Sequence, residues 1–208
     1  MAGIGDDIKE VLNELGTTSL ISRISGDTFE EKVDVESFPT HSSEFIRQFF
    51  YIITLPFDTS ALNGDNVEFK GLHFVLTNIV ESYFEDLVVD NAAALYKCNV
   101  YGVLKRSTII TDSNYVKKKT FAAVVANPDS IHALQYENKF GMEPLFEEDS
   151  QMLLKEKHIL VLPAGLDIKV GDRWYPDYTD DTIYYKIAAF ETRRLSNCPI
   201  CTLAEDTR

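Results

Sequence analysis

The chain has 208 residues, of which 45% are hydrophobic and 12% aromatic, and this composition favours a packed core over disorder. Its formal net charge of −13 argues against general DNA binding and against binding to anionic membranes. No apolar stretch approaches the ~20 residues of a membrane-spanning helix, and the N-terminal residues lack the basic and apolar regions of a signal peptide. Three cysteines, an odd number, argue against a disulfide framework, so we expect synthesis in a reducing cytoplasm.

Residues 1–16 predict a short amphipathic helix that ends at Gly16. A helix of this length is marginal alone, so it must dock on its own barrel or on a neighbouring subunit. We expect its apolar face to be an interface. That face carries Ile4, Ile8, Val11, Leu12 and Leu15.

From residue 17 onward, β-branched and aromatic residues with a period of two predict strands. We expect a first β module over residues 17–104 and a second over residues 119–208. Residues 105–118 are polar and are interpreted as a connector or an exposed hairpin. The basic run Lys117–Lys119 would suit a phosphate backbone, although such runs are usually solvated surface.

An internal repeat is the most informative feature. Residues 52–56, which end in Leu55-Pro56, recur as residues 159–163, which end in Leu162-Pro163. The pair Gly64-Asp65 recurs as Gly171-Asp172 at the same displacement of 107 positions. The strand at residues 73–76 recurs at residues 184–187, after an insertion of four residues in the second copy.

The repeat has a consistent physical meaning in both copies. A buried strand ends at proline, which cannot donate to a following ladder, and a Gly-Asp pair then forms a tight turn. The sequence therefore predicts a mainly β protein with two similar small antiparallel barrel or sandwich modules and an N-terminal helix. The predicted turn motif consists of Gly64, Asp65, Gly171 and Asp172.

Candidate chemistry is sparse in this sequence. Cys198 and Cys201 have the spacing of a redox pair or half a zinc site, but their flanks predict a turn and a strand rather than a helix start. We therefore expect two thiols at a strand end, one of them buried. We expect no catalytic residues, no bound metal and no cofactor.

An aromatic cluster surrounds the second Gly-Asp turn. Such a cluster would stack on bases or sugars, or form barrel core or a subunit interface, and the second use is commoner. The cluster contains Trp174, Tyr175, Tyr178, Tyr184 and Tyr185.

The C-terminal module resembles the small barrel of tailed-phage head-completion proteins, the stoppers or connectors between portal and tail. The resemblance covers about the last fifty residues well and the first module loosely. The residues that carry it are Leu162-Pro163, the run 168–173, the run 184–187, Arg193-Arg194 and the run 203–206.

The resemblance implies a structural subunit of the virion neck, made in the host cytoplasm and without a cofactor or turnover. It implies a homo-oligomeric ring of six or twelve subunits that binds the portal or adaptor and the tail, and through which DNA passes without specific binding. Other tail, baseplate or decoration proteins, a carbohydrate-binding module that uses Trp174 and an unrecognised enzyme remain as alternatives. The chain is about twice the usual length of a stopper.

Overall fold

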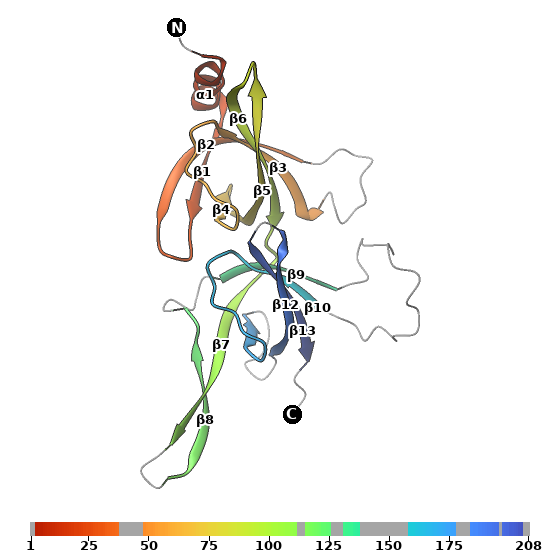
Figure 1. Ribbon diagram of the computed structural model, residues 1–208. Coiled ribbons are helices and arrows are strands. Elements are labelled where there is room, and N and C mark those ends of the chain that lie inside the picture. Colours follow the sequence, from red (N-terminus) through yellow and green to blue (C-terminus); the bar gives the residue numbers. More distant parts are fainter. Residues whose placement is uncertain are drawn as a thin grey trace.

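A computed structural model describes residues 3–37, 48–111, 115–125, 131–137, 158–177, 184–195 and 197–205. Within these ranges the chain forms one helix and thirteen strands, arranged as two β-barrels stacked one above the other (Figure 1). Every strand pairing is antiparallel. The predicted fold class, two similar β modules with an N-terminal helix, is confirmed.

The first barrel is closed, with the strand order β1-β2-β3-β6-β5-β4. Aliphatic and aromatic side chains that alternate along these strands fill its interior, among them Ile21, Ile53 and Phe74. The strands are β1 (Thr17–Ser22), β2 (Thr28–Ser37), β3 (Phe50–Pro56), β4 (Asn66–Phe69), β5 (Leu72–Phe84) and β6 (Leu87–Lys97).

The second barrel has the order β7-β9-β10-β13-β12-β11 and is closed by the pairing of β11 with β7. Strand β8 lies outside the barrel and pairs with the outer half of β7. The strands are β7 (Val100–Thr111), β8 (Lys117–Ala123), β9 (Ile131–Glu137), β10 (His158–Val161), β11 (Arg173–Pro176), β12 (Tyr185–Leu195) and β13 (Cys198–Glu205).

The two barrels have the same topology, strand for strand. The pair Ile21 and Val67 joins β1 to β4, and the pair Leu104 and Trp174 joins β7 to β11 at the corresponding place. Pro56 ends β3, and Pro163 follows the equivalent strand β10 after one residue. The sequence repeat is therefore a repeat of the whole barrel.

The boundary between the barrels differs from the expected one. Strand β6 ends at Lys97 and β7 begins at Val100, so only Cys98 and Asn99 connect the barrels. The segment Val100–Leu104 belongs to the second barrel, and the expected connector 105–118 lies mostly in the hairpin of β7 and β8. The expected boundary at residue 104 was wrong because residues 93–104 form an almost continuous apolar run, in which the short break at residues 98–99 is not visible, whereas the alternative of an exposed hairpin for residues 105–118 agrees with the pairing of β7 with β8.

The helix α1 (Ile4–Leu15) docks on its own barrel, against β6, β2 and β3. Leu12 is buried, whereas Val11 and Leu15 are 54% and 81% exposed, so only part of the apolar face is used. Gly5 lets the helix approach closely, because a Cβ there would lie 3.1 Å from the Phe57 ring. Gly16 ends the helix in an extended conformation with φ −67°, not in the left-handed one.

Candidate functional site

The first Gly-Asp turn is held by a set of short hydrogen bonds. The Asp65 carboxylate accepts a bond from the Leu62 amide at 2.8 Å, and the Gly64 amide donates to the Leu76 carbonyl at 2.7 Å. Gly64 has φ +94°, a conformation that favours glycine. The turn thus joins the loop before β4 to β5.

The second turn repeats these bonds residue for residue. The Asp172 carboxylate accepts from the Lys169 amide at 2.8 Å, and the Gly171 amide donates to the Ile187 carbonyl at 2.8 Å. Gly171 has φ +96°. The four predicted turn residues therefore have equivalent structural roles in the two barrels.

Each turn aspartate also binds an arginine. Arg23 Nε lies 3.2 Å from Asp65 Oδ1, and Arg106 holds Asp172 with two bonds of 2.9 Å. Arg106 also donates to Asp167 at 2.7 Å, which lowers the pKa of that exposed carboxyl. Burial raises the pKa of Asp65, and the hydrogen bond from the Leu62 amide and the charge of Arg23 oppose that rise.

Sequence analysis missed these two arginines. Each one follows a fully buried strand residue by two positions, Ile21 before Arg23 and Leu104 before Arg106. An arginine two positions after an apolar strand residue was therefore the sequence pattern that could have identified both residues. It is shifted by 83 positions rather than 107, because Arg106 and Asp172 are 66 positions apart whereas Arg23 and Asp65 are 42 positions apart.

The barrels meet through direct backbone contact. The Ala164 amide donates a hydrogen bond to the Gly64 carbonyl at 3.0 Å, and the Cys198 thiol lies 3.9 Å from the Leu76 carbonyl oxygen. Beside these contacts, the rings of His73 and His132 stack with centroids 3.6 Å apart. Burial, and then the charge of His73, lower the pKa of His132.

The two cysteines of the predicted pair do not form a joint site. Both thiols are fully buried, whereas we expected only one of them to be buried. Three positions apart on β13, they point to opposite faces: Cys201 belongs to the barrel core and Cys198 faces the first barrel. Burial raises the pKa of each thiol to about 12. Among the described residues, no group of His, Cys, Asp or Glu is arranged to bind a metal.

The predicted aromatic cluster divides into core and surface. Trp174 is fully buried and donates from its indole nitrogen to Gln135 Oε1 at 3.3 Å, so its ring is closed to a sugar or a base. The rings of Tyr175 and Tyr184 lie 5.1 Å apart on the barrel surface. Tyr178 lies outside the described residues.

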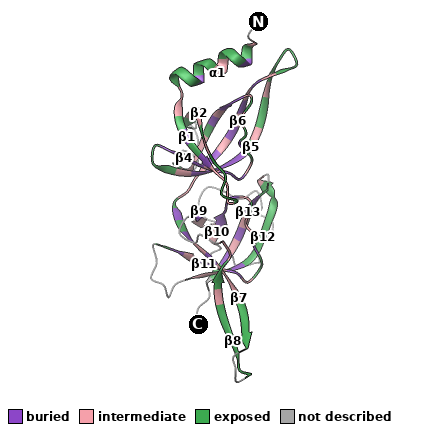
Figure 2. Ribbon diagram, turned by 90° about the vertical axis from the view of Figure 1, so that its left-hand side faces the viewer, coloured by how far each residue is buried: buried purple, intermediate pink, exposed green. Residues whose placement is uncertain are grey.

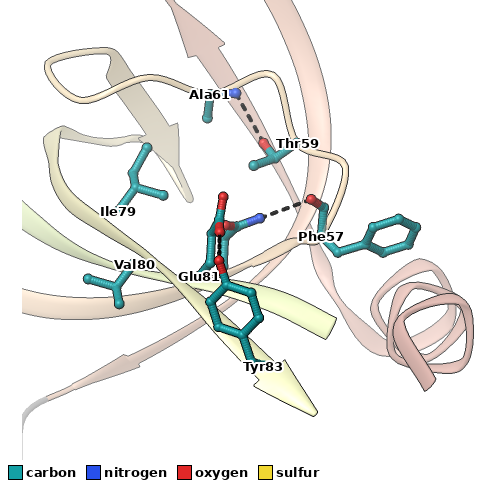
Figure 3. A pocket seen from close by; sticks show the side chains of 8 residues that line it. Phe57, Thr59, Ala61, Ile79, Val80, Glu81 and Tyr83 are labelled. Atoms are coloured by element: carbon teal, nitrogen blue, oxygen red, sulfur yellow. Dashed lines mark hydrogen bonds between the residues drawn. The ribbon is translucent and has the colours of Figure 1, made fainter. Parts of the chain in front are cut away.

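A hollow of about 460 Å³ lies at the helix end of the first barrel, between the loop after β3 and the β5–β6 hairpin. Figure 3 shows its polar rim, where the Tyr83 hydroxyl donates to the Glu81 carboxylate. The lining residues are Phe57, Thr59, Ala61, Ile79, Val80, Glu81, Tyr83 and Asn91.

The loop that borders this hollow is fixed from several sides. Asp58 forms an ion pair with Lys9 of the helix, and the Thr59 hydroxyl donates to Glu31 at 2.6 Å. Asn91 donates to the carbonyl of Phe57 at 3.2 Å. Burial raises the pKa of Glu31, with the Thr59 bond acting in the opposite direction. These contacts fix the shape of the wall of the hollow.

At the opposite end of the molecule, the outer half of β7 and the whole of β8 project from the second barrel (Figure 1). We call residues 105–123 the arm. Its base is braced by the Arg173 guanidinium, which lies 3.9 Å from the Phe121 ring centroid and 4.0 Å from that of Tyr184. Lys105 lies over Tyr175 at 4.4 Å. Tyr175 and Tyr184, both predicted as interface residues, therefore lie at the foot of the arm.

Comparison of this chain with protein-family models, with curated proteins and with solved structures returned no match. In the part of the chain that the structure describes, no helix combines the length and the apolar composition needed to cross a membrane. The molecule consists of one barrel duplicated, with a projecting element at each end.

Proposed function

We propose that this chain is a structural subunit of the neck of a tailed phage. In this role it forms a ring that joins the portal or its adaptor to the tail and lines or closes the DNA channel. The observation that carries the proposal is the repetition of one six-stranded barrel, with a different projecting element at each end of the pair. A connector must bind different partners at its two ends, and this arrangement supplies two unlike ends on one chain.

Three further features support the proposal. The C-terminal barrel carries the strand, turn and tyrosine pattern that resembles stopper proteins. The net charge of −13 suits a channel through which DNA slides, because like charges prevent adhesion. The connection between the barrels is only two residues long, and a hydrogen bond between Ala164 and Gly64 also joins them, so the two barrels are held close together.

The duplication also suggests how the neck changes symmetry. Six chains, each with two similar barrels, would present twelve modules, and such a ring would match a twelve-fold portal on one side and a six-fold tail on the other. Native mass spectrometry of the purified assembly tests this: six chains per ring are expected, and a ring of twelve chains would remove the symmetry argument.

Location in the virion tests the function itself. Antibody or gold labelling of the chain in intact particles is expected at the junction of head and tail, and particles made without it are expected to be heads that lack attached tails. Labelling at the baseplate, along the tail or on the capsid surface would contradict the neck location and assign the chain to the labelled site instead. Absence of the chain from purified particles would contradict a virion role altogether.

A further inference from the structure

The arm is a two-stranded ribbon that projects from the second barrel, and most of its described residues are exposed. Both of its faces are exposed: Ile109 and Ile110, which point to opposite faces, are 70% and 55% exposed, and Tyr115 at the turn is 90% exposed (Figure 2). A two-stranded hairpin is marginally stable in water, and exposed apolar residues gathered in one place mark interaction surfaces. The arm therefore has the features of an element that becomes covered.

The arm is also basic. Residues 105–123 contain five basic residues and one acidic residue, in a chain whose formal net charge is −13. On the ribbon, Ile109 pairs across the strands with Lys119, so apolar and basic groups share a face. Lys117 stands beside them near the turn. An apolar centre with a charged border is the usual anatomy of a protein interface.

The complementary surface lies at the other end of the same chain. Residues 1–97 contain 17 of the 33 acidic residues and 6 of the 20 basic residues, so they carry a net charge of −11 out of −13. The β5–β6 hairpin concentrates this charge near its tip, with Glu81, Glu85 and Asp86 exposed. Beside them Tyr83 and Leu87 are 62% and 66% exposed, next to the hollow of Figure 3. We call this hairpin and the hollow the acidic end.

We propose that the arm of one copy docks on the acidic end of a second copy of this chain. Apolar side chains of the arm enter the hollow beside Tyr83, and the arm lysines face the hairpin carboxylates. The arm and the acidic end lie at opposite ends of the molecule, so the arm cannot contact the acidic end of its own chain (Figure 1). The contact joins unlike surfaces and repeats from copy to copy, giving a closed ring or an open chain.

This inference rests on the part of the proposed function that makes the chain a subunit of a homo-oligomer. It does not depend on the neck as the location. Nucleic acid is the competing occupant for a run of lysines. The acidic end favours the second copy, because DNA that reached the arm would leave the exposed apolar residues of both ends uncovered.

Charge exchange tests the contact. Sedimentation velocity of the purified full chain at low salt is expected to show concentration-dependent association that weakens as salt is added. Lys117→Glu/Lys119→Glu is expected to raise the dissociation constant about tenfold or more, given the energies of exposed ion pairs. Glu81→Lys/Glu85→Lys should have a similar effect. The chain with all four changes should associate again, since the charges are exchanged. Lys186→Glu/Arg193→Glu, with the same charge change on the exposed face of β12, is the matched control.

Two further measurements test whether an arm variant still folds and where the arm contacts the second copy. Ile109→Ser/Ile110→Ser removes the apolar part of the arm without altering charge, and it should weaken association while the thermal unfolding midpoint stays close to that of the parent. Carbodiimide cross-linking followed by mass spectrometry should join Lys117 or Lys119 to Glu81, Glu85 or Asp86. Such a link must connect two copies, because these residues lie at opposite ends of one chain.

The outcomes separate the two proposals. A parent chain that stays monomeric at all concentrations, or arm variants that associate as strongly as the parent and the β12 control, would overturn the inference. Cross-links from the arm lysines to other surfaces would do the same. Capture of a DNA duplex that the arm changes abolish, with association unchanged, would assign the arm to nucleic acid. Confirmed arm docking in a chain absent from virions would leave the inference standing and remove the neck function alone.

Discussion

Gly64 and Ala164 touch where the two barrels meet. The Ala164 amide donates a hydrogen bond to the Gly64 carbonyl at 3.0 Å, and a Cβ built on Gly64 would lie 2.1 Å from the Ala164 Cβ. The equivalent residue of the second barrel, Gly171, has a similar positive φ, but among the described residues other than its chain neighbours no atom lies within 4 Å of a built Cβ. The same turn therefore serves as a docking point in the first barrel and as a free turn in the second.

Substitution of the two glycines separates backbone strain from docking. Gly171→Ala should cost about 1–2 kcal/mol in the free energy of unfolding, because only the positive φ is penalised. Gly64→Ala should cost about 2 kcal/mol more, since the methyl group overlaps Ala164 and must push the barrels apart. Urea unfolding of both variants measures the difference. Equal costs would mean that the Gly64–Ala164 contact does not hold the barrels together.

Loss of Arg106 should destabilise the second barrel. Asp172 is 2% exposed and would keep a buried charge without its partner, so Arg106→Ala should lower the free energy of unfolding by about 3 kcal/mol. Asp167→Asn, which removes the exposed partner of the same arginine, should change the stability much less than Arg106→Ala does and serves as the control. Adding Asp172→Asn to Arg106→Ala should recover part of the loss. A double variant no more stable than the single one would show that the cost is lost packing rather than an unpaired charge.

The free energy of unfolding should decrease as the pH is lowered, because His132 at the junction of the barrels becomes protonated. The pKa of His132 in the folded chain is lowered by burial and by His73, with Glu68 acting in the opposite direction. The unfolded chain therefore takes up the proton first, so the contribution of neutral His132 is complete above the unfolded pKa of about 6.5 and is lost as the pH falls below it. His132→Gln should flatten this dependence between pH 7.5 and 5. Parallel stability curves for the parent and the variant would contradict the assignment.

The cysteines should resist alkylation in the folded protein. Burial raises the pKa values of Cys98, Cys198 and Cys201 to about 12, so about one thiol in 10⁴ is ionised at pH 8. Iodoacetamide should modify the native chain very slowly and the urea-unfolded chain completely, as measured by intact mass. Rapid modification of the native chain at one site would indicate a reactive thiol and reopen a redox role for that cysteine.

The local elements were predictable because their signals are local. Spacing of apolar residues marked the helix, and period-two alternation marked most strands. The displacement shared by Leu55-Pro56 and Gly64-Asp65 revealed the repeat, because a conserved turn needs the same residue types in both copies. The role of Ala164 could not be predicted in this way, since its contact at the junction is with a glycine 100 positions earlier in the chain.

Composition, periodicity and the shared displacement were enough to establish a strand-rich chain built from two copies of one unit, because strand alternation and turn chemistry are properties of neighbouring residues. Only the tertiary structure decided where one barrel ends, which arginine holds which aspartate, and that Trp174 is core rather than surface. Those outcomes depend on strands brought together from distant positions. The separation of a basic arm from an acidic end is likewise a consequence of stacking two barrels end to end, which no segment of the sequence encodes by itself.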